Sequence, residues 1–330
     1  MAFSIIKPGL LDTIQDMGRN GYGSMGINPG GCMDRYAARV ANLLVGNCEN
    51  EPILEVHFPG PQILFEQNTL ISITGADFSP TVNDEIIPRW QPVVVRKNTV
   101  LHFPAHVEGS RCYIGVHGGY CADKWLGSYS THLKAGIGGW EGRALKKGDE
   151  LPFKENTIYF AGLLKEQNNY EVLPWRVNTG KVYNHPHEIG FIPGKEWDLL
   201  STQTQQQFTQ NNFMIHPSSD RMGYQLKGSP LHLEQPVDLV SSAVSFGTVQ
   251  LLPQGQLIVL MADHQTTGGY PRIAHVISAH LPKLAQLRPC DTIQFRRMDL
   301  EDAEAMVIAG EKELHILKRA CMDHLNELVC

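Results

Sequence analysis

The sequence predicts a mainly β protein with a few helices, built as tandem β-barrel modules. Two observations carry this fold class. Gly and Pro number 31 and 20 in 330 residues, so turn signals follow one another at short intervals. Between the turns lie short runs rich in Val, Ile, Leu, Phe and Thr, found within 63–75, 92–103, 110–119 and 256–262. Short strands separated by turns are typical of β-barrels and β-sandwiches rather than of alternating β–α units.

A weak repeat favours barrels. The stretches KNTVLHF (97–103), KGDELPF (147–153) and PCDTIQF (289–295) each place a turn before a short strand that ends in Phe. Two of them carry an aspartate, Asp149 or Asp291, at the same place. We interpret the three as one supersecondary unit used more than once; the alternative is that any β protein yields such coincidences.

Two segments have helical periodicity. In 33–46 the apolar positions follow i, i+4, i+7, i+8 and i+11, Asp34 is expected in the first turn, and Gly46 supplies the stop. The tail from about 300 to 328 places Leu314, Leu317, Cys321 and Leu325 on one side. We expect this tail to pack against its own domain, with a docking helix as the alternative.

Length and composition limit the number of domains and the classes of binding partner that we expect. A chain of 330 residues suggests two domains. We divide it into an N-terminal barrel-like domain (1–175), a C-terminal barrel (176–298) and a helical tail (299–330). The net charge of −6 does not favour nucleic acid or an anionic membrane. No segment resembles a signal peptide or a bilayer span, and the seven cysteines lack a CxxC pair, so we expect a cytoplasmic protein.

Several glycine-rich stretches are candidate binding sites. The loop 24–34 could hold an anion at a helix start, although it lacks the P-loop lysine, and turn-making also explains its glycines. The stretch 74–77 ends in Asp77, a candidate ligand or a turn cap. In 116–149, we expect backbone to approach a ligand or another chain closely. There the candidate substrate- or nucleotide-binding residues are Gly118, Gly119, Ser128, Ser130, Thr131 and Arg143.

Two further stretches offer catalytic groups. The first, 218–224, sets Asp220 beside Arg221, which could equally form an intramolecular ion pair. The second, 262–276 (ADHQTTGGYPRIAHV), interrupts an apolar region with polar side chains and a Gly-Gly pair. Its candidate catalytic residues are Asp263, Gln265, Thr266 and Thr267, and its candidate binding residues are Gly268, Gly269 and Tyr270. The histidines of 185–188 lack clear third and fourth ligands, so we expect no metal site there.

Five of these stretches together resemble a known family. GLLDTIQDMGRNGYGSMGINPGGCMD, ITGAD, HGGY…LGSYSTHLKAGIGGWEGRALKKGDEL, SDRMGYQL and ADHQTTGGYPRIAHVI are similar to the allophanate hydrolase subunit 2, or biotin-dependent carboxyltransferase-like, family. That family includes the C subunit of bacterial 5-oxoprolinase, KipA proteins and the carboxyltransferase region of urea carboxylase. The resemblance implies that the barrel modules are cyclophilin-like.

The resemblance also implies partners and a reaction. Stand-alone members pair with a smaller KipI-like subunit, and in 5-oxoprolinase a LamB/YcsF-like subunit joins them to open 5-oxoproline to glutamate with ATP and Mg²⁺. This chain has no Met-Lys-Met biotin attachment motif, so we expect no covalently bound biotin on it. The leading hypothesis is therefore an ATP-dependent 5-oxoprolinase subunit. The alternatives are carboxyl transfer to a urea-like acceptor with biotin supplied in trans, and a non-catalytic regulator of a KipI-like partner.

Three residues depart from the family pattern. Cys32 stands where a small Ala is usual, and Cys290 stands where Gly usually precedes Asp291. His264 stands where a small residue is common before Gln265. We interpret the two cysteines as small-residue exchanges, and His264 as a change of substrate preference or a solvent-facing side chain.

Overall fold

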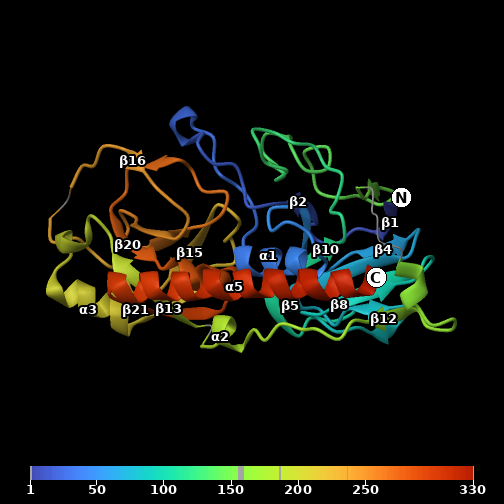
Figure 1. Cartoon of the computed structure of the whole chain (residues 1–330). Helices are drawn as coiled ribbons and strands as arrows, with labels where there is room; N and C mark the ends of the chain where they lie inside the picture. The colour runs from blue at the N-terminus through green and yellow to red at the C-terminus, as the bar shows by residue number, and fades with distance from the viewer. Residues whose placement is uncertain (1, 155–159, 186, 236, 330) are drawn as a thin grey trace. The chain divides into compact units, whose positions relative to one another are not determined.

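The computed structural model describes residues 2–154, 160–185, 187–235 and 237–329. Figure 1 labels the elements of two compact units. Unit 1 comprises Met1–Gly18, Asp34–Thr179 and Lys312–Cys330, and unit 2 comprises Arg19–Met33 and Gly180–Glu311. Residues 19–33 thus belong to unit 2, and residues 312–330 of the tail belong to unit 1. The division proposed from the sequence, at residues 175 and 299, instead assigns 19–33 to the N-terminal domain and 299–330 to a separate tail.

Two antiparallel sheets form unit 1. The first runs in the order β11 (Glu150–Pro152), β1 (Ala2–Lys7), β4 (Gln62–Phe65), β9 (Val100–His102), β6 (Thr81–Val82) and β7 (Glu85–Ile86). The second runs β12 (Tyr170–Val172), β8 (Pro92–Val95), β5 (Thr69–Asp77), β10 (Glu108–Val116), β3 (Ile53–His57) and β2 (Thr13–Gln15). Ile5 and Ile63 of the first sheet share one hydrophobic cluster with Ile71 and Ile114 of the second, so the sheets enclose a common core.

Helix α1 (Arg35–Leu44) covers β5 and β10. It is the helix expected at 33–46. Asp34 is its N-cap rather than a residue of the first turn, and the Asp34 side chain accepts a hydrogen bond from the Ala37 N–H. Ser72 donates its hydroxyl to the Ala41 carbonyl, 2.6 Å away. A Cβ on Gly115 would lie 2.8 Å from the same oxygen, so glycine is what allows the helix to approach β10 this closely.

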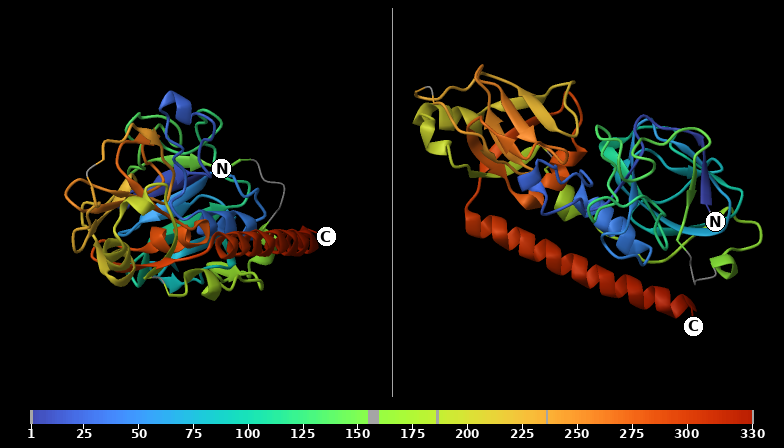
Figure 2. Two further views of the ribbon diagram at one scale, coloured as in Figure 1. Left: turned by 90° about the vertical axis from the view of Figure 1, so that its left-hand side faces the viewer. Right: turned by 90° about the horizontal axis from the view of Figure 1, so that it is seen from above.

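Unit 2 is a closed seven-stranded barrel, which confirms the predicted fold class. Its strands follow the order β13 (Glu188–Pro193), β20 (Arg272–Val276), β17 (Thr248–Leu251), β18 (Leu257–Leu260), β15 (Gly223–Lys227), β14 (Asn212–Ile215) and β21 (Thr292–Arg297). Only the β13–β21 pairing among these is parallel. Figure 2 shows these strands in yellow to red around the barrel interior. A small ribbon, β16 (Ser242–Ala243) with β19 (Thr267–Gly268), and helices α2 (Gly180–Tyr183), α3 (Thr202–Gln210) and α4 (Leu281–Gln286) complete the unit.

The sequence repeat has a structural counterpart. Asn98, Gly148 and Cys290 occupy equivalent positions and all have left-handed φ, at 64°, 87° and 73°. Each precedes a strand, β9, β11 or β21. Asp149 accepts a hydrogen bond from the Lys146 N–H, and Asp291 accepts one from the Arg288 N–H. The three turns therefore share a left-handed residue, and two of them share the aspartate cap, which supports the interpretation of a reused unit. The φ of Cys290 is one that glycine adopts without strain.

The tail forms helix α5 (Leu300–Val329). Leu314, Cys321 and Leu325 are buried as expected, whereas Leu317 is half-buried. Within unit 1, Leu325 joins a cluster with Val45, Leu70, Val94 and others. The His324 ring stacks on Trp175 with 5.1 Å between ring centroids. The end of α5 is thus packed on unit 1.

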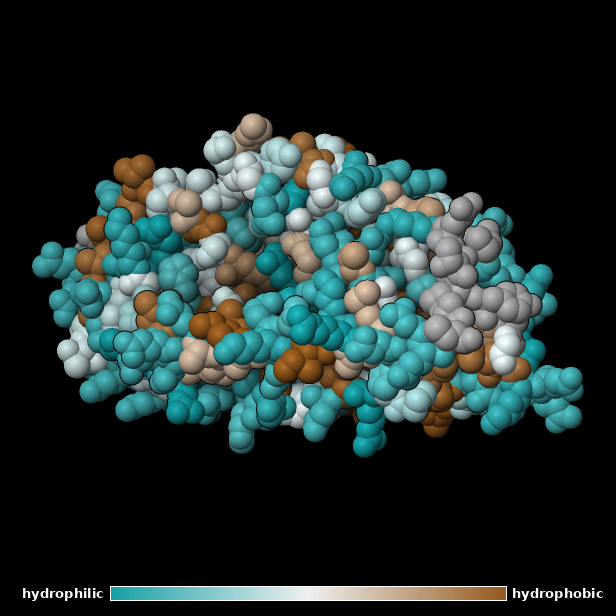
Figure 3. Space-filling view, in the orientation of Figure 1, coloured by the Kyte–Doolittle hydropathy of each residue, from teal (hydrophilic) through white to brown (hydrophobic). Residues whose placement is uncertain are grey.

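The helices of the described ranges were compared with what a membrane-spanning helix needs. None of them combines the length and the apolar composition that crossing a bilayer requires. On the face drawn in Figure 3, hydrophilic residues predominate and hydrophobic residues are scattered among them.

Candidate functional site

The pairing of β15 with β18 brings two predicted stretches together. Gly223 lies opposite Leu260 in this antiparallel ladder. The residues just before β15 therefore lie beside the residues just after β18. The ladder continues one step further, because the Asp263 N–H donates to the Arg221 carbonyl at 2.8 Å. This backbone pairing joins the 218–224 stretch to the 262–276 stretch.

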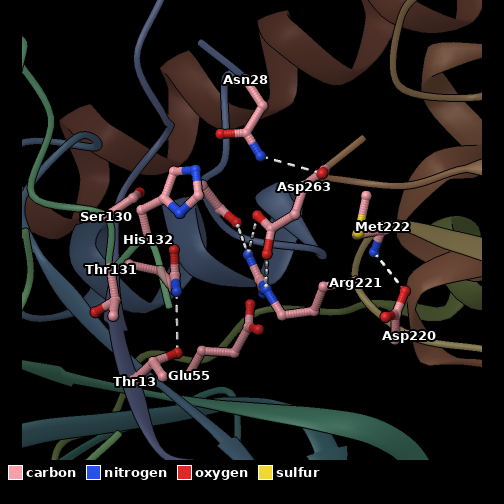
Figure 4. A network of polar contacts seen from close by, with 12 residues as sticks. Thr13, Asn28, Glu55, Ser130, Thr131, His132, Asp220, Arg221, Met222 and Asp263 are labelled. Atoms are coloured by element: carbon pink, nitrogen blue, oxygen red, sulfur yellow. Dashed lines mark hydrogen bonds and ion pairs between the residues drawn. The ribbon is translucent and has the colours of Figure 1, made fainter. Parts of the chain in front are cut away.

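Asp263 and Arg221 then form a two-point ion pair. Arg221 Nε lies 2.8 Å from Asp263 Oδ2, and Arg221 Nη2 lies 3.1 Å from Oδ1. The guanidinium is buried, with an exposed side-chain fraction of 8%, and the carboxylate is 23% exposed. Figure 4 shows the two side chains pointing toward each other. A bidentate pair fixes the orientation of the carboxylate as well as its position.

The glycine-rich loop of 24–34 packs on this pair. Arg221 Nη2 donates to the Gly31 carbonyl at 2.6 Å, and Asn28 Nδ2 donates to the Asp263 carbonyl at 3.1 Å. Gly30 and Gly31 have φ of 61° and 93°, a conformation that glycine adopts without strain. A Cβ on Gly30 would lie 2.9 Å from Nη1 of the buried Arg19. The glycines thus serve the close packing of this loop on two arginines.

Asp220 does not join the ion pair of its neighbour. It is exposed, and its Oδ1 accepts hydrogen bonds from the Met222 and Gly223 N–H groups, at 2.8 and 3.3 Å. The intramolecular partner of Arg221 is therefore Asp263, 42 positions away, rather than the adjacent acid. Asp220 acts as a turn cap in this structure.

The rest of the 262–276 stretch supplies the ribbon strand β19 (Thr267–Gly268) and then the barrel strand β20 (Arg272–Val276). Gln265, Thr267, Gly269 and Tyr270 are exposed, and Thr266 and Gly268 are half-buried. Thr267 pairs with Ala243, and Gly268 pairs with Ser242. His264 is buried, with Nδ1 2.6 Å from the Gln265 carbonyl, so its ring does not face solvent. The predicted residues of this stretch therefore separate into Asp263 at the ion pair, Thr267 and Gly268 on the ribbon, and the others in the segments that flank β19.

In unit 1, the hydroxyls of Ser128 and Ser130 serve a buried carboxylate. Both donate to Asp16 Oδ1, at 2.7 and 2.5 Å, and the Tyr129 N–H donates to Oδ2 at 2.7 Å. Thr131 donates its hydroxyl to the Ile14 carbonyl at 2.9 Å. All of these groups except Tyr129 are buried. The three hydroxyls predicted to be substrate donors are thus used inside the unit.

The other predicted binding residues of unit 1 also have partners. The Gly118 N–H donates to Asn47 Oδ1 at 2.8 Å, and the Gly119 N–H donates to the Val116 carbonyl. Arg143 contacts Asp149 through two hydrogen bonds of 2.7 and 2.9 Å, and this interaction lowers the pKa of the Asp149 carboxyl.

Asp77, the candidate ligand or turn cap of the 74–77 stretch, has partners as well. Its side chain caps a turn by accepting a hydrogen bond from the Ser79 N–H, and it lies 2.9 Å from Arg89.

Sequence reasoning missed a second polar cluster, on the outer face of the unit 2 barrel. Arg272 contacts Glu196 at 2.8 and 3.0 Å. Burial opposes ionisation of Glu196, but the hydrogen bonds from Arg272 outweigh it and lower the pKa of this carboxyl. Burial, with the charge of Arg272, lowers the pKa of His275. The alternation of polar Thr248 and Gln250 with apolar residues in TVQLL is the sequence signal that marks this face.

The described residues contain no cluster of metal ligands. Among residues 2–154, 160–185, 187–235 and 237–329, no group of three or more His, Cys, Asp or Glu side chains is arranged to hold an ion. In the 185–188 stretch, Pro186 lies outside the described residues, and His187 Nδ1 lies 2.7 Å from the Thr292 carbonyl.

Comparison with known families identifies the chain. The model of the family described as carboxyltransferase domain, subdomain A and B, matches residues 25–297. The chain belongs to this family. The match includes the ion pair, most of the glycine-rich loop and the whole barrel of unit 2. It confirms the resemblance that the five sequence motifs indicate.

Relatives within the family differ in architecture. The chain is 37% identical over 307 residues to the C subunit of 5-oxoprolinase from Haemophilus influenzae, covering 93% of this chain and 94% of that protein. It is 31% identical to the urea amidolyase of Saccharomyces cerevisiae, covering 92% of this chain but 17% of that protein. The crystal structure of the Kluyveromyces lactis urea amidolyase matches with a TM-score of 0.84 at 29% identity, over 96% of this chain. The chain spans about a fifth of that solved chain, 20%.

Proposed function

We propose that this chain is a subunit of an ATP-dependent 5-oxoprolinase, which opens 5-oxoproline to L-glutamate. The observation that carries the proposal is the end-to-end match to the C subunit of a 5-oxoprolinase, 37% identical over 94% of that protein. A second such relative, from Escherichia coli, matches over 92% of its length. A subunit requires partners, and we propose a KipI-like small subunit and a LamB/YcsF-like subunit.

The lactam of 5-oxoproline is a stable amide, so its hydrolysis needs activation. Overall, 5-oxoproline, ATP and two water molecules give glutamate, ADP and phosphate. Transfer of a phosphoryl group from ATP to the lactam oxygen would activate the ring carbon. Water would add to that carbon, and the ring C–N bond would break to leave the free amine and an acyl phosphate. A second water would then release phosphate and give the glutamate carboxylate. Fixed polar groups stabilise the charge that develops in such a step. We propose that the Asp263 carboxylate, held in place by Arg221, is the hydrogen-bond acceptor that this chain contributes to the reaction.

We further propose that the nucleotide phosphates are bound mainly by a partner subunit. Gly118, Ser128, Ser130 and Arg143 of unit 1 direct their donors to Asn47, Asp16 and Asp149. A phosphate would have to displace these contacts before the same donors could bind it. These hydrogen-bond donors of unit 1 therefore do not form a site that could bind a phosphate without rearrangement. The chain also lacks a biotin attachment motif.

The test is reconstitution from purified proteins. The chain is mixed with the small partner and the LamB/YcsF-like protein, and glutamate is measured with and without ATP. We expect ATP-dependent glutamate that disappears when any one protein is omitted. In the same assay, Asp263→Asn should reduce turnover by about a hundredfold or more, while Asp220→Asn, which changes an exposed turn cap, should not. Absence of glutamate from the complete mixture would overturn the proposal.

The alternative function is carboxyl transfer to a urea-like acceptor. Its support is the backbone match to the Kluyveromyces lactis urea amidolyase, at a TM-score of 0.84. Biotin would then be delivered by a separate carrier protein. Transfer of labelled carboxylate from carboxybiotin to urea, without glutamate formation, would favour this function. A stable complex with the small partner and no turnover of either substrate would instead indicate a regulator.

A further inference from the structure

Gln250 on β17 is a buried side chain that the proposed function leaves unexplained. Its exposed fraction is 1%. Neither Oε1 nor Nε2 has a hydrogen-bond partner among the described residues. An unpaired buried amide costs about 1–3 kcal/mol, and folded proteins pair the large majority of such groups. Both hydrogen-bonding atoms of this carboxamide are therefore available to a bound molecule.

Its neighbours show that the fold satisfies other polar groups on the same face. Val249 and Leu251 belong to the barrel core, so the alternating side chains of Thr248 and Gln250 lie on the outer face. The Thr248 hydroxyl accepts a hydrogen bond from the Ser245 N–H at 3.1 Å and lies 3.3 Å from His275 Nδ1. Two positions along the same strand, the Gln250 amide has no such partner in the described part of the chain.

Arg272 lies opposite Gln250 in the β17–β20 ladder. Its guanidinium is already engaged by Glu196, and its Nη1 donates to the Ala243 carbonyl at 3.1 Å. The arginine therefore holds the β16 strand in place instead of satisfying the glutamine.

The β16–β19 ribbon, Ser242–Ala243 with Thr267–Gly268, is the lid over this amide. A Cβ on Gly268 would lie 2.4 Å from Gln250 Nε2, so the ribbon backbone rests directly on the carboxamide. Each strand of the ribbon has two residues. A two-stranded ribbon this short has little stability of its own. Opening of the ribbon would uncover Gln250 without disturbing the barrel ladders.

We propose that Gln250 binds the amide edge of a small cyclic amide or urea-type ligand when the β16–β19 ribbon lifts. A carboxamide presents an acceptor, Oε1, and a donor, Nε2, side by side. A lactam or urea presents the complementary pair on one edge, an N–H donor beside a carbonyl acceptor. Two parallel hydrogen bonds would then satisfy both Gln250 atoms at once. The inference rests on the proposed function for the choice of 5-oxoproline as the natural ligand.

The first test measures binding by calorimetry or ligand-observed NMR, on the chain and on its complex with the small partner. The probes are 5-oxoproline, 2-pyrrolidinone, urea and N-methyl-2-pyrrolidinone, which keeps the carbonyl but lacks the N–H. We expect 2-pyrrolidinone to bind at least tenfold more tightly than its N-methyl analogue. We expect Gln250→Met to abolish this difference in affinity. Gln254→Met, a change at an exposed glutamine in the turn after β17, should preserve it.

Three outcomes would overturn the inference: equal binding of the two analogues, no binding of any probe, or an unaffected Gln250→Met variant. The preference between 2-pyrrolidinone and urea tells a lactam site from a urea site.

The second test separates a binding role from a structural one. Replacing an unpaired buried amide with an apolar side chain of similar length should leave the thermal midpoint unchanged or raise it. A clear loss of stability in Gln250→Met would assign Gln250 to the fold and contradict the inference.

The inference and the proposed function can fail separately. If the reconstituted complex forms glutamate and Gln250→Met leaves KM and kcat unchanged, the function stands and the inference is wrong. If the complex forms no glutamate, yet binding of 2-pyrrolidinone or urea depends on Gln250, the inference stands and the function is wrong.

Discussion

Asp263 and Arg221 form a two-point ion pair at the place where β15 begins and β18 ends. The pair exists because the antiparallel register of these strands continues beyond the Gly223–Leu260 pair, through the Asp263 N–H and the Arg221 carbonyl. The same guanidinium reaches the Gly31 carbonyl. One buried arginine therefore fixes both the carboxylate and the glycine-rich loop, which couples the geometry of two motifs distant in sequence.

The ion pair should show strong energetic coupling. A double-mutant cycle of Arg221→Gln and Asp263→Asn, measured by urea unfolding, should give an interaction free energy of about 1–3 kcal/mol. The reason is that each single change leaves a largely buried polar partner unsatisfied. Arg296 and Glu188, an exposed pair 3.0 Å apart, provide the control, with an expected coupling below about 1 kcal/mol. Additive effects of the Arg221 and Asp263 changes would contradict a coupled pair.

Ser130 should contribute to stability rather than to substrate affinity. Its hydroxyl donates to the buried Asp16 carboxylate, so Ser130→Ala should lower the free energy of unfolding by about 1–3 kcal/mol. Chemical denaturation measures this change, and KM of the reconstituted complex should stay the same. Ser229→Ala, at an exposed serine, should change stability by less than about 0.5 kcal/mol. A raised KM in Ser130→Ala with unchanged stability would support the substrate-donor role that the sequence suggested.

Asp12 should make stability depend on pH. Burial raises the pKa of its carboxyl from 3.8 to about 7, against the opposing hydrogen bond from the Gly9 N–H. Between these two pKa values the folded state keeps a proton that the unfolded state has lost. The contribution of Asp12 to the free energy of unfolding therefore falls as pH rises from about 4 to about 7, and is level above that range.

The Asp12 effect can be isolated by substitution. Unfolding free energies of the native chain and of Asp12→Asn are compared across that pH range. The difference between the two proteins should change with pH in favour of the variant as pH rises, because asparagine does not ionise. A constant difference across the range would show that Asp12 does not titrate in this way.

Cys290→Gly should stabilise the turn before β21. Cys290 has φ of 73°, a conformation that costs a non-glycine residue about 1–2 kcal/mol. Removal of the side chain should raise the free energy of unfolding by up to about 1 kcal/mol, after the entropy that glycine loses on folding. Cys48→Gly is the matched control, since Cys48 is also exposed but is not among the residues with left-handed φ. A loss of stability in both variants would rule out relief of strain at Cys290.

The sequence by itself determined the fold class, the helices and the family. Short apolar runs between turns are local signals, so the barrel strands could be predicted. The helix at 33–46 follows from apolar periodicity, although Asp34 is its N-cap and not a residue of the first turn. The family follows from motifs that can be read directly as short stretches of sequence, and the match over residues 25–297 confirms it.

Tertiary structure alone decided which polar groups meet. Arg221 could pair with its neighbour Asp220 or with a distant acid, and only the β15–β18 register selects Asp263. The hydroxyls of Ser128 and Ser130 look like substrate donors until the chain brings Asp16 beside them. Gln250 alternates with apolar residues in its strand, as Thr248 does, and only the fold shows that its amide is buried beneath Gly268 without a partner among the described residues. Strand formation depends on nearby residues, whereas the pairing of polar groups depends on residues tens to more than a hundred positions apart, so a local pattern cannot specify it.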